Sequence, residues 1–375
     1  MPRKYIHQHS AWPELKWDQE QLLVPLAQVR HQQGRLIGRV ESLGFNLRAE
    51  AELKTLTLDV LKSSEIEGEI LDAGLVRSSV ARRLGVDIGG LEQADRQIDG
   101  LVEMMLNAIH HYQEPLTKNR LFDWHAAMFP TGRSGLTKIS VGSWRNDASG
   151  PMQVVSGPVG KETVHFEAPD AARIDEEMAV FLDWLESEIV VEPVLKAGLA
   201  HLWFVTIHPF HDGNGRLARA ITDMMLARSE QSSHRFYSMS TQIRLERKDY
   251  YRILERTQSG SLDVTGWLEW FLACLSRTLS RAQDTLSSVL YKAKFWNRLG
   301  SHTVNPRQQK MLNRILDDEF KGHLTTSKWA KMTKCSQDTA YRDILDLMKA
   351  GVLSKNPGGG RSTSYSIAER LDNKP

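Results

Sequence analysis

One stretch constrains this chain more than any other: His208-Pro-Phe-His-Asp-Gly-Asn-Gly-Arg-Leu-Ala-Arg219. It joins two segments, 199–207 and 217–226, whose apolar residues recur at helical spacing. The pattern predicts a helix, a short loop and a second helix. The first N–H groups of a helix lack internal partners and, together with the helix dipole, favour an anion. The stretch therefore indicates a phosphate site at a helix N-terminus.

The side chains of this stretch also suit an anion. Arg216 and Arg219 lie three residues apart, on one side of the predicted second helix, and a guanidinium matches phosphate oxygens. Gly213 and Gly215 let the backbone approach a phosphate that a side chain would block, and Asn214 can donate to a phosphate oxygen. By itself Gly-Asn-Gly is more typical of a tight turn. The whole stretch favours the phosphate site.

Two further residues suit phosphoryl or nucleotidyl transfer, which needs positioning and charge neutralisation more than covalent chemistry. His208 can take a proton from an attacking hydroxyl, because an imidazole titrates near working pH. Asp212 offers hard oxygen ligands for Mg²⁺ shared with substrate phosphates. The plainer alternative is that His208-Pro-Phe only ends a helix.

The stretch matches the pattern H-x-F-x-[D/E]-G-N-G-R-x-x-R at every position, and the chain thereby resembles the Fic family. Fic proteins transfer AMP from ATP to a hydroxyl side chain of a target protein. The resemblance implies that His208 is the base that activates this hydroxyl. It implies that Asp212 holds Mg²⁺ between the α- and β-phosphates, and that Phe210 anchors the loop in the core.

The resemblance also assigns the phosphate contacts. It implies that Asn214 and the Gly213–Gly215 backbone form an anion cradle, with Arg216 at the β-phosphate and Arg219 at the γ-phosphate. The kinase-like branch of the family has lysine where Gly215 stands. This glycine therefore favours AMP transfer, with ATP and Mg²⁺ as the required small molecules, over phosphate transfer.

A second signature lies in the N-terminal part. Helical spacing predicts a helix over residues 47–67, and Gly68 is a plausible stop signal. Carboxylates at Glu65, Glu67 and Glu69 oppose the helix dipole at this end. Such a cluster is either a solvated helix end or requires a cation from elsewhere in the fold.

Ser63, Glu67 and Gly68 resemble the Fic inhibitory motif, [S/T]-x-x-x-E-[G/N]. The resemblance implies that Glu67 pairs with Arg219 and denies this arginine to the γ-phosphate. A member of the family with this motif on its N-terminal side is autoinhibited.

A hairpin is predicted from residues 141–145 and 152–157, which alternate apolar and polar side chains around Gly and Pro. It resembles the Fic flap, which aligns a target segment over the active site by strand pairing. The alternative is an ordinary surface hairpin. Residues 157–163 superficially resemble a P-loop but lack the required spacing.

Amphipathic helices are predicted over 247–254 and 266–272. They resemble the helices that complete the Fic core, which would let Tyr251 stack on the nucleoside and Gln258 reach the base. The alternative for a tyrosine at helical spacing is a place in the core.

The last 75 residues form a separate pattern. Helices are predicted over 305–316, 324–332 and 336–348, and two strands, 351–355 and 362–367, flank a glycine-rich tip. This part resembles a winged helix-turn-helix domain, a module that binds either DNA or protein.

The charges of that segment are mixed. Arg342 and Lys349 of its third helix are accompanied by Asp338, Asp343 and Asp346, which makes this helix a poor phosphate-binding surface. Lys355 and Arg361 of the wing could contact backbone phosphates. DNA is therefore a possible partner only.

We predict a mainly α fold, a helical bundle with a small β-hairpin flap. The expected domains are an N-terminal helical domain with the inhibitory helix (1–90), a Fic catalytic core (91–290) and a winged helix-turn-helix (300–375). The first resembles the extra N-terminal domain fused to many bacterial Fic proteins.

Composition limits the setting. The 375 residues are 41% hydrophobic and 25% charged, which fits an ordinary globular protein. A net charge of +2 argues against wholesale polyanion binding. The 2 cysteines and the absence of a signal peptide or membrane span predict a cytoplasmic protein.

The sequence leaves several alternatives open. The chain is a protein adenylyltransferase, a DNA-binding regulator whose Fic part senses nucleotide, or an enzyme that removes AMP with Glu67 positioning water. The target, the choice of Tyr, Thr or Ser as acceptor, and the oligomeric state are open, although the resemblance suggests a homodimer.

Overall fold

The structure is a computed structural model. It describes residues 4–41, 45–88, 92–148, 150–158, 160–161, 163–188, 190–300, 303–316, 320, 322–357 and 363–368.

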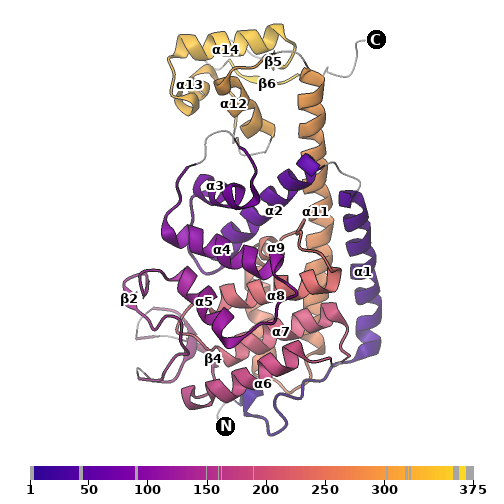
Figure 1. Cartoon of the computed structure of the whole chain (residues 1–375), viewed down its shortest axis with the longest axis vertical. Helices are drawn as coiled ribbons and strands as arrows, with labels where there is room; N and C mark the ends of the chain where they lie inside the picture. Colours follow the sequence, from indigo (N-terminus) through magenta and orange to yellow (C-terminus); the bar gives the residue numbers. More distant parts are fainter. Residues whose placement is uncertain are drawn as a thin grey trace. The chain divides into compact units, whose positions relative to one another are not determined.

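Helices dominate the described residues, as Figure 1 shows, and the predicted mainly α class is confirmed. The α-helices are α1 (Gln19–Glu41), α2 (Phe45–Ile66), α3 (Ala73–Leu84), α4 (Arg96–His110), α5 (Lys118–Met128), α6 (Ile174–Glu186), α7 (Pro193–Ile207), α8 (Asn214–Glu230), α9 (Met239–Leu245), α10 (Arg247–Gln258), α11 (Thr265–Leu299), α12 (Pro306–Leu316), α13 (Thr326–Thr333) and α14 (Gln337–Lys349). Short 3-10 helices cover Ile6–Gln8 and Ala171–Arg173.

The strands form three separate antiparallel pairs in the part of the chain described. The pairs are β1 (Arg133–Ser134) with β2 (Thr137–Lys138), β3 (Gln153–Ser156) with β4 (Thr163–Glu167), and β5 (Leu353–Lys355) with β6 (Tyr365–Ile367).

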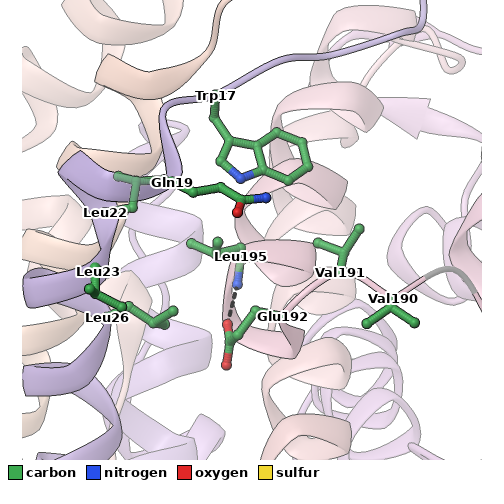
Figure 2. A pocket seen from close by; sticks show the side chains of 9 residues that line it. All are labelled: Trp17, Gln19, Leu22, Leu23, Leu26, Val190, Val191, Glu192 and Leu195. Atoms are coloured by element: carbon green, nitrogen blue, oxygen red, sulfur yellow. Dashed lines mark hydrogen bonds between the residues drawn. The ribbon is translucent and has the colours of Figure 1, made fainter.

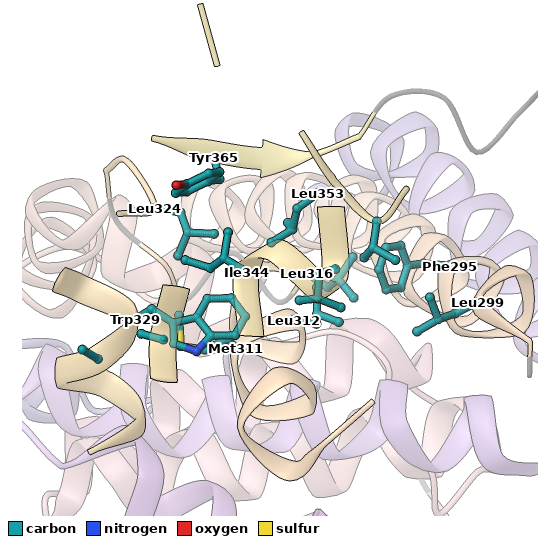
Figure 3. Packing of buried hydrophobic residues seen from close by; sticks show 14 residues of the cluster. Phe295, Leu299, Met311, Leu312, Leu316, Leu324, Trp329, Ile344, Leu353 and Tyr365 are labelled. Atoms are coloured by element: carbon teal, nitrogen blue, oxygen red, sulfur yellow. The ribbon is translucent and has the colours of Figure 1, made fainter. Parts of the chain in front are cut away.

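The chain divides into two compact units, Met1–Gln283 and Asp284–Pro375. Both sides of the boundary predicted near residue 90 lie in the first unit, so a separate domain over 1–90 stays a prediction. The second unit begins within α11, whose last residues pack against α12 to α14. Figure 3 shows its core, where Trp329 and Ile344 are fully buried between helices and strands.

Charges in the second unit are arranged differently from the sequence expectation. Asp343 of α14 is buried and receives hydrogen bonds from the Arg307 guanidinium and the Asn305 amide. The sequence predicts that Asp343 repels a phosphate at the surface of this helix. Because its carboxylate is buried and paired, it does not do so. Arg361 lies outside the described residues, and DNA contact stays a prediction.

The centre of the first unit is the pair α7 and α8, which pack against each other. Every residue of α7 from Val194 to Ile207 is buried, as expected for a helix that is apolar on all sides. Pro193 occupies its first turn, and the Glu192 carboxylate accepts from the N–H groups of Val194 and Leu195. Helices α4 and α5 pack against α8, and α6 packs against α7, so the loop 208–213 lies between two helices that are covered by their neighbours.

The predicted hairpin is wrong in its first strand. Residues 141–145 form no strand; β3 pairs instead with β4, whose sequence is Thr-Val-His-Phe-Glu and of which only Phe166 is buried. The physical reason is that Arg145 uses its backbone N–H on the carbonyl of Pro209, at 2.9 Å, rather than on a neighbouring strand. Within the segment that superficially resembled a P-loop, Thr163 is the first residue of β4, and the described residues before it follow β3 without entering a helix.

Close packing of α4 on α5 depends on Gly100. A methyl group there would lie 1.8 Å from the carbonyl oxygen of Ala127, and a backbone atom cannot move aside cheaply. We expect Gly100→Ala to lower the free energy of unfolding by about 1–3 kcal/mol or more. Gly34→Ala, with nothing within 4 Å in the exposed middle of α1, is the matched control.

Thermal and denaturant unfolding of both variants would check this. Gly34→Ala should raise stability by up to about 1 kcal/mol, since alanine is the better helix former. Equal effects of the two substitutions would contradict the proposed contact.

Candidate active site

The loop 208–213 leaves α7 through an unusual backbone conformation. His208 has φ 53°, in the left-handed region that non-glycine residues rarely adopt, and its N–H donates to Phe204 O at 3.0 Å. Such conformations persist where the surroundings fix them, and they are frequent at functional sites. The turn points the chain from the end of α7 back toward the start of α8.

Two buried side chains from other elements fix this loop. Arg145 donates through Nε to His208 O at 2.8 Å and through its backbone N–H to Pro209 O. His125 of α5 accepts from the Gly142 N–H through Nδ1, at 3.2 Å, which leaves Nε2–H to donate to Asp212 O, also at 3.2 Å. Sequence reasoning did not identify either residue as part of the site, because a buried brace has no local sequence pattern.

The Asn214 side chain differs from expectation. Its Oδ1 accepts from the Phe210 N–H at 3.0 Å, and its Nδ2 donates to Phe210 O at 2.7 Å. The oxygen and the nitrogen of this side-chain amide both close the loop. The side chain therefore shapes the turn rather than presenting its amide to an anion. Phe210 is fully buried and stacks on His125, with ring centroids 4.2 Å apart.

Helix α8 begins without a side-chain cap. Gly213 is its N-cap residue with φ 84°, which favours glycine, and a Cβ there would lie 3.0 Å from Met128 and Phe129 side-chain atoms. The N–H groups of Asn214, Gly215 and Arg216 precede the first intrahelical bond, which Leu217 N–H makes to Gly213 O. Helix α8 thus begins where the sequence predicted a helix N-terminus, and no side chain among the described residues caps it.

Arg216 and Arg219 are both buried, at 4% and 1% exposure. Arg219 donates through Nε to Ser63 Oγ and through Nη2 to Ser63 O, both at 2.9 Å. Its Nη2 also lies 2.8 Å from Glu67 Oε1. Burial acts to lower the pKa of Arg219, but the Glu67 carboxylate and the nearby tyrosines Tyr250 and Tyr251 together raise that pKa, so the guanidinium stays charged.

Gly215 has a steric role that the sequence did not reveal. A Cβ at this position would lie 2.2 Å from Glu67 Oε1. The missing side chain makes room for the Glu67 carboxylate beside Arg219. The structure therefore brings Ser63, Glu67, Gly215 and Arg219 together, while Gly68 turns the chain away from α2 with φ 88°.

Asp212 lies beside the same helix end. Its Oδ1 accepts from the Gly213 N–H at 2.6 Å, its Oδ2 accepts from Ser134 Oγ of β1, and Arg216 Nη2 lies 3.8 Å away. The described residues contain no group of three or more His, Cys, Asp or Glu side chains suited to a metal ion. A single carboxylate that shares Mg²⁺ with phosphates is not such a group, so the predicted role of Asp212 stays a prediction.

The two residues expected at the nucleoside differ in their placement. Tyr251 is half-buried beside the Arg247 guanidinium, 5.2 Å from its ring, and burial together with the Glu67 charge raises its pKa. It therefore lies near the Glu67 carboxylate. Gln258 is buried and donates to Thr206 Oγ1 at 3.2 Å, so this side chain supports the end of α7 and does not face a base.

His208 is uncharged at neutral pH. Burial lowers its pKa to about 4, although the hydrogen bond between Nδ1 and Val205 O, at 3.3 Å, acts in the opposite direction. At pH 7 this imidazole is in the deprotonated form that a general base requires.

A pocket of about 210 Å³ lies elsewhere in the first unit, between the start of α1 and the start of α7 (Figure 2). Trp17, Leu22 and Leu195 are among its lining residues. It is at the opposite end of α7 from His208 and contains none of the predicted site residues. The site described here is instead formed around the N-terminus of α8.

Comparisons with known proteins identify relatives of this chain. The Fic/DOC family profile matches residues 115–226, and a domain of unknown function, DUF4172, matches residues 5–86. The protein adenylyltransferase Fic of Nematostella vectensis is 32% identical over 113 residues, 30% of this chain and 25% of that protein. That of Culex quinquefasciatus is 24% identical over 254 residues, 65% of this chain and 44% of that protein. The chain thus spans less than half of either relative.

Solved structures share the fold. A Fic family protein from Desulfovibrio desulfuricans G20 superimposes with a TM-score of 0.52 at 20% identity, covering 95% of this chain and 98% of that one. A Fic domain containing signaling protein from Bacteroides thetaiotaomicron gives 0.51 at 20% identity, over 70% and 97% of the two chains. Fold and site together define a Fic-domain protein. The chain contains a Fic domain over residues 115–226, and the resemblance predicted from the sequence is confirmed.

No helix among the described residues is both long and apolar enough to cross a membrane.

The charge state of His208 is directly testable. We expect its imidazole to titrate with a midpoint near pH 4 and to stay neutral from pH 6 to 8, because burial disfavours the charged form. Histidine ring resonances followed by NMR against pH would show this, with His208→Asn used for assignment. A midpoint near 6.5, the ordinary value for histidine, would contradict the burial described here.

Proposed function

We propose that this protein transfers AMP from ATP to a hydroxyl side chain of a target protein, and that Glu67 restrains this activity. One observation carries the proposal: a neutral histidine, an uncapped helix N-terminus and two buried arginines lie within one turn and the start of α8. Adenylyltransferases among the relatives support the same reaction.

In this mechanism His208 accepts the proton of the acceptor hydroxyl. The hydroxyl oxygen bonds to the α-phosphorus of ATP, the bond to the bridging oxygen breaks, and pyrophosphate leaves. The N–H groups at the start of α8 and the two guanidiniums stabilise the charge on the phosphates. Asp212 would hold Mg²⁺, which supplies further charge neutralisation when bound.

The proposed restraint of AMP transfer by Glu67 is based on the contacts of Arg219. Ser63 and Glu67 use Nε and Nη2, the groups that a γ-phosphate would need. Breaking a buried ion pair by removing one partner costs roughly 3–5 kcal/mol, so the pair is not displaced without a competing anion. Reversing a 1:99 population requires about 5.5 kcal/mol of differential binding. A metal-bound triphosphate or a changed contact at α2 supplies energy of that order.

The β3–β4 hairpin is the proposed docking element for the target. Val155 and Val164 are paired across its two strands and are 47% and 37% exposed. An extended target segment that pairs with a hairpin edge is held mainly by main-chain hydrogen bonds, so few of its side chains are selected. This explains why neither the target nor its acceptor residue can be named from the site.

We expect Glu67→Gly to raise AMP transfer at least about tenfold, the effect of roughly 1.4 kcal/mol, and His208→Ala to abolish it. The assay uses ATP labelled at the α-phosphate with Mg²⁺, and ATP labelled at the γ-phosphate in a parallel reaction. Label from the α-phosphate alone identifies AMP transfer, and label from the γ-phosphate identifies a kinase.

Glu65→Gly is the matched control, because Glu65 pairs with Lys62 at 2.5 Å and with Arg244 at 3.3 Å rather than with Arg219. It should not activate the enzyme at equal folded fraction. Equal labelling of the wild type and Glu67→Gly would contradict the proposed restraint by Glu67. Loss of label from a target that already carries AMP would instead favour AMP removal as the reaction.

A further inference from the structure

A second carboxylate, that of Glu69, pairs with the other arginine of the site, Arg216. Glu69 Oε2 lies 2.9 Å from Arg216 Nη1, and Arg216 is buried. The other oxygen of Glu69 accepts a hydrogen bond from Gln97 Nε2 of α4. Glu69 is thus held from two sides, and it lies beyond the motif that suggested a role for Glu67.

The spacing of the two carboxylates matches the spacing of the two arginines. Arg216 and Arg219 are three residues apart in α8 and so lie on one helix side. Glu67 and Glu69 flank Gly68, whose φ of 88° turns the chain so that each carboxylate meets a different guanidinium. The segment 67–69 therefore acts as an internal dianion at the site.

The two guanidinium groups have further hydrogen-bond donors that the carboxylates of Glu67 and Glu69 do not use. Within the described residues, Arg216 Nε and Arg219 Nη1 are buried without a hydrogen-bond partner. A buried donor left unpaired is costly, so such groups indicate a ligand with more acceptor oxygens than a carboxylate offers. Adjacent phosphates are ligands of that kind.

We propose that Glu69 determines how many phosphates the site admits, acting as a second gate that is separate from Glu67. This rests on the proposed function, in which Arg216 serves the second phosphate and Arg219 the third. While both arginines are occupied, the free N–H groups at the start of α8 remain for one phosphate. A nucleoside monophosphate then binds, a diphosphate must displace Glu69, and a triphosphate must displace both carboxylates.

The test measures binding of AMP, ADP and ATP by isothermal titration calorimetry with Mg²⁺. All proteins carry His208→Ala, which prevents turnover. The variants are Glu67→Gln, Glu69→Gln and their combination; glutamine keeps the shape of each side chain and removes its charge. Glu65→Gln is the control, since Glu65 contacts neither arginine of the site.

We expect Glu69→Gln to tighten ADP binding by at least about tenfold and to leave AMP binding unchanged, because only the second phosphate gains a partner. Glu67→Gln should tighten ATP binding and leave ADP binding near the wild-type value. The double variant should bind ATP more tightly than either single variant. Glu65→Gln should match the parent for all three nucleotides.

Unchanged or weaker ADP binding by Glu69→Gln would overturn the inference; weaker binding would mean that Glu69 orients Arg216 for phosphate instead of covering it. Absence of nucleotide binding in every variant would also overturn it. If the affinities change as stated but no α-label is transferred by the proteins with His208 intact, the proposed reaction fails and the phosphate gate stands.

Discussion

The site depends on two guanidiniums buried at the positive end of a helix dipole. Arg216 and Arg219 lie in the first turns of α8, where a cation is unfavourable and an anion is stabilised. Buried charges without partners are strongly destabilising, so this arrangement requires anions nearby. The chain supplies Glu67 and Glu69, and a nucleotide would supply phosphates. One physical requirement thus accounts for the two carboxylates that meet these arginines and for the anion site that we propose.

The shape of the loop depends on a second set of contacts, made by residues distant in sequence. Arg145 and His125 hold its carbonyl groups, and Asn214 closes it on the backbone of Phe210. Arg145 also pairs with Asp147, which in turn accepts from the Ala171 N–H beyond the β3–β4 hairpin. The residues that follow the hairpin and the His208 loop are therefore held by the same pair, Arg145 and Asp147.

Helix α2, which carries Ser63 and precedes Glu67, is joined to the rest of the first unit by more than its contact with Arg219. Glu52 of α2 is buried with its carboxylate 2.9 Å from His234, and the hydrogen bond that His234 Nδ1 donates to this carboxylate raises the pKa of His234. Asp59, also buried in α2, accepts from Ser238 Oγ. These contacts lie along the helix before Glu67, so they fix the position of α2 and allow its last residues to meet α8.

The sequence by itself determined the helical class, the helix–loop–helix around His208 and the segment that ends at Glu67, because apolar periodicity, glycine and charge at fixed spacing are local signals. It also placed α2 and α12 to α14 within two residues of their observed ends. Only the tertiary structure decided that β3 pairs with β4, that Asn214 and Gln258 support the backbone, and that Glu69 meets Arg216. Each of these contacts joins groups that are far apart in the sequence and that only the fold brings within hydrogen-bonding distance. The periodicity of residues along the chain carries no information about such contacts.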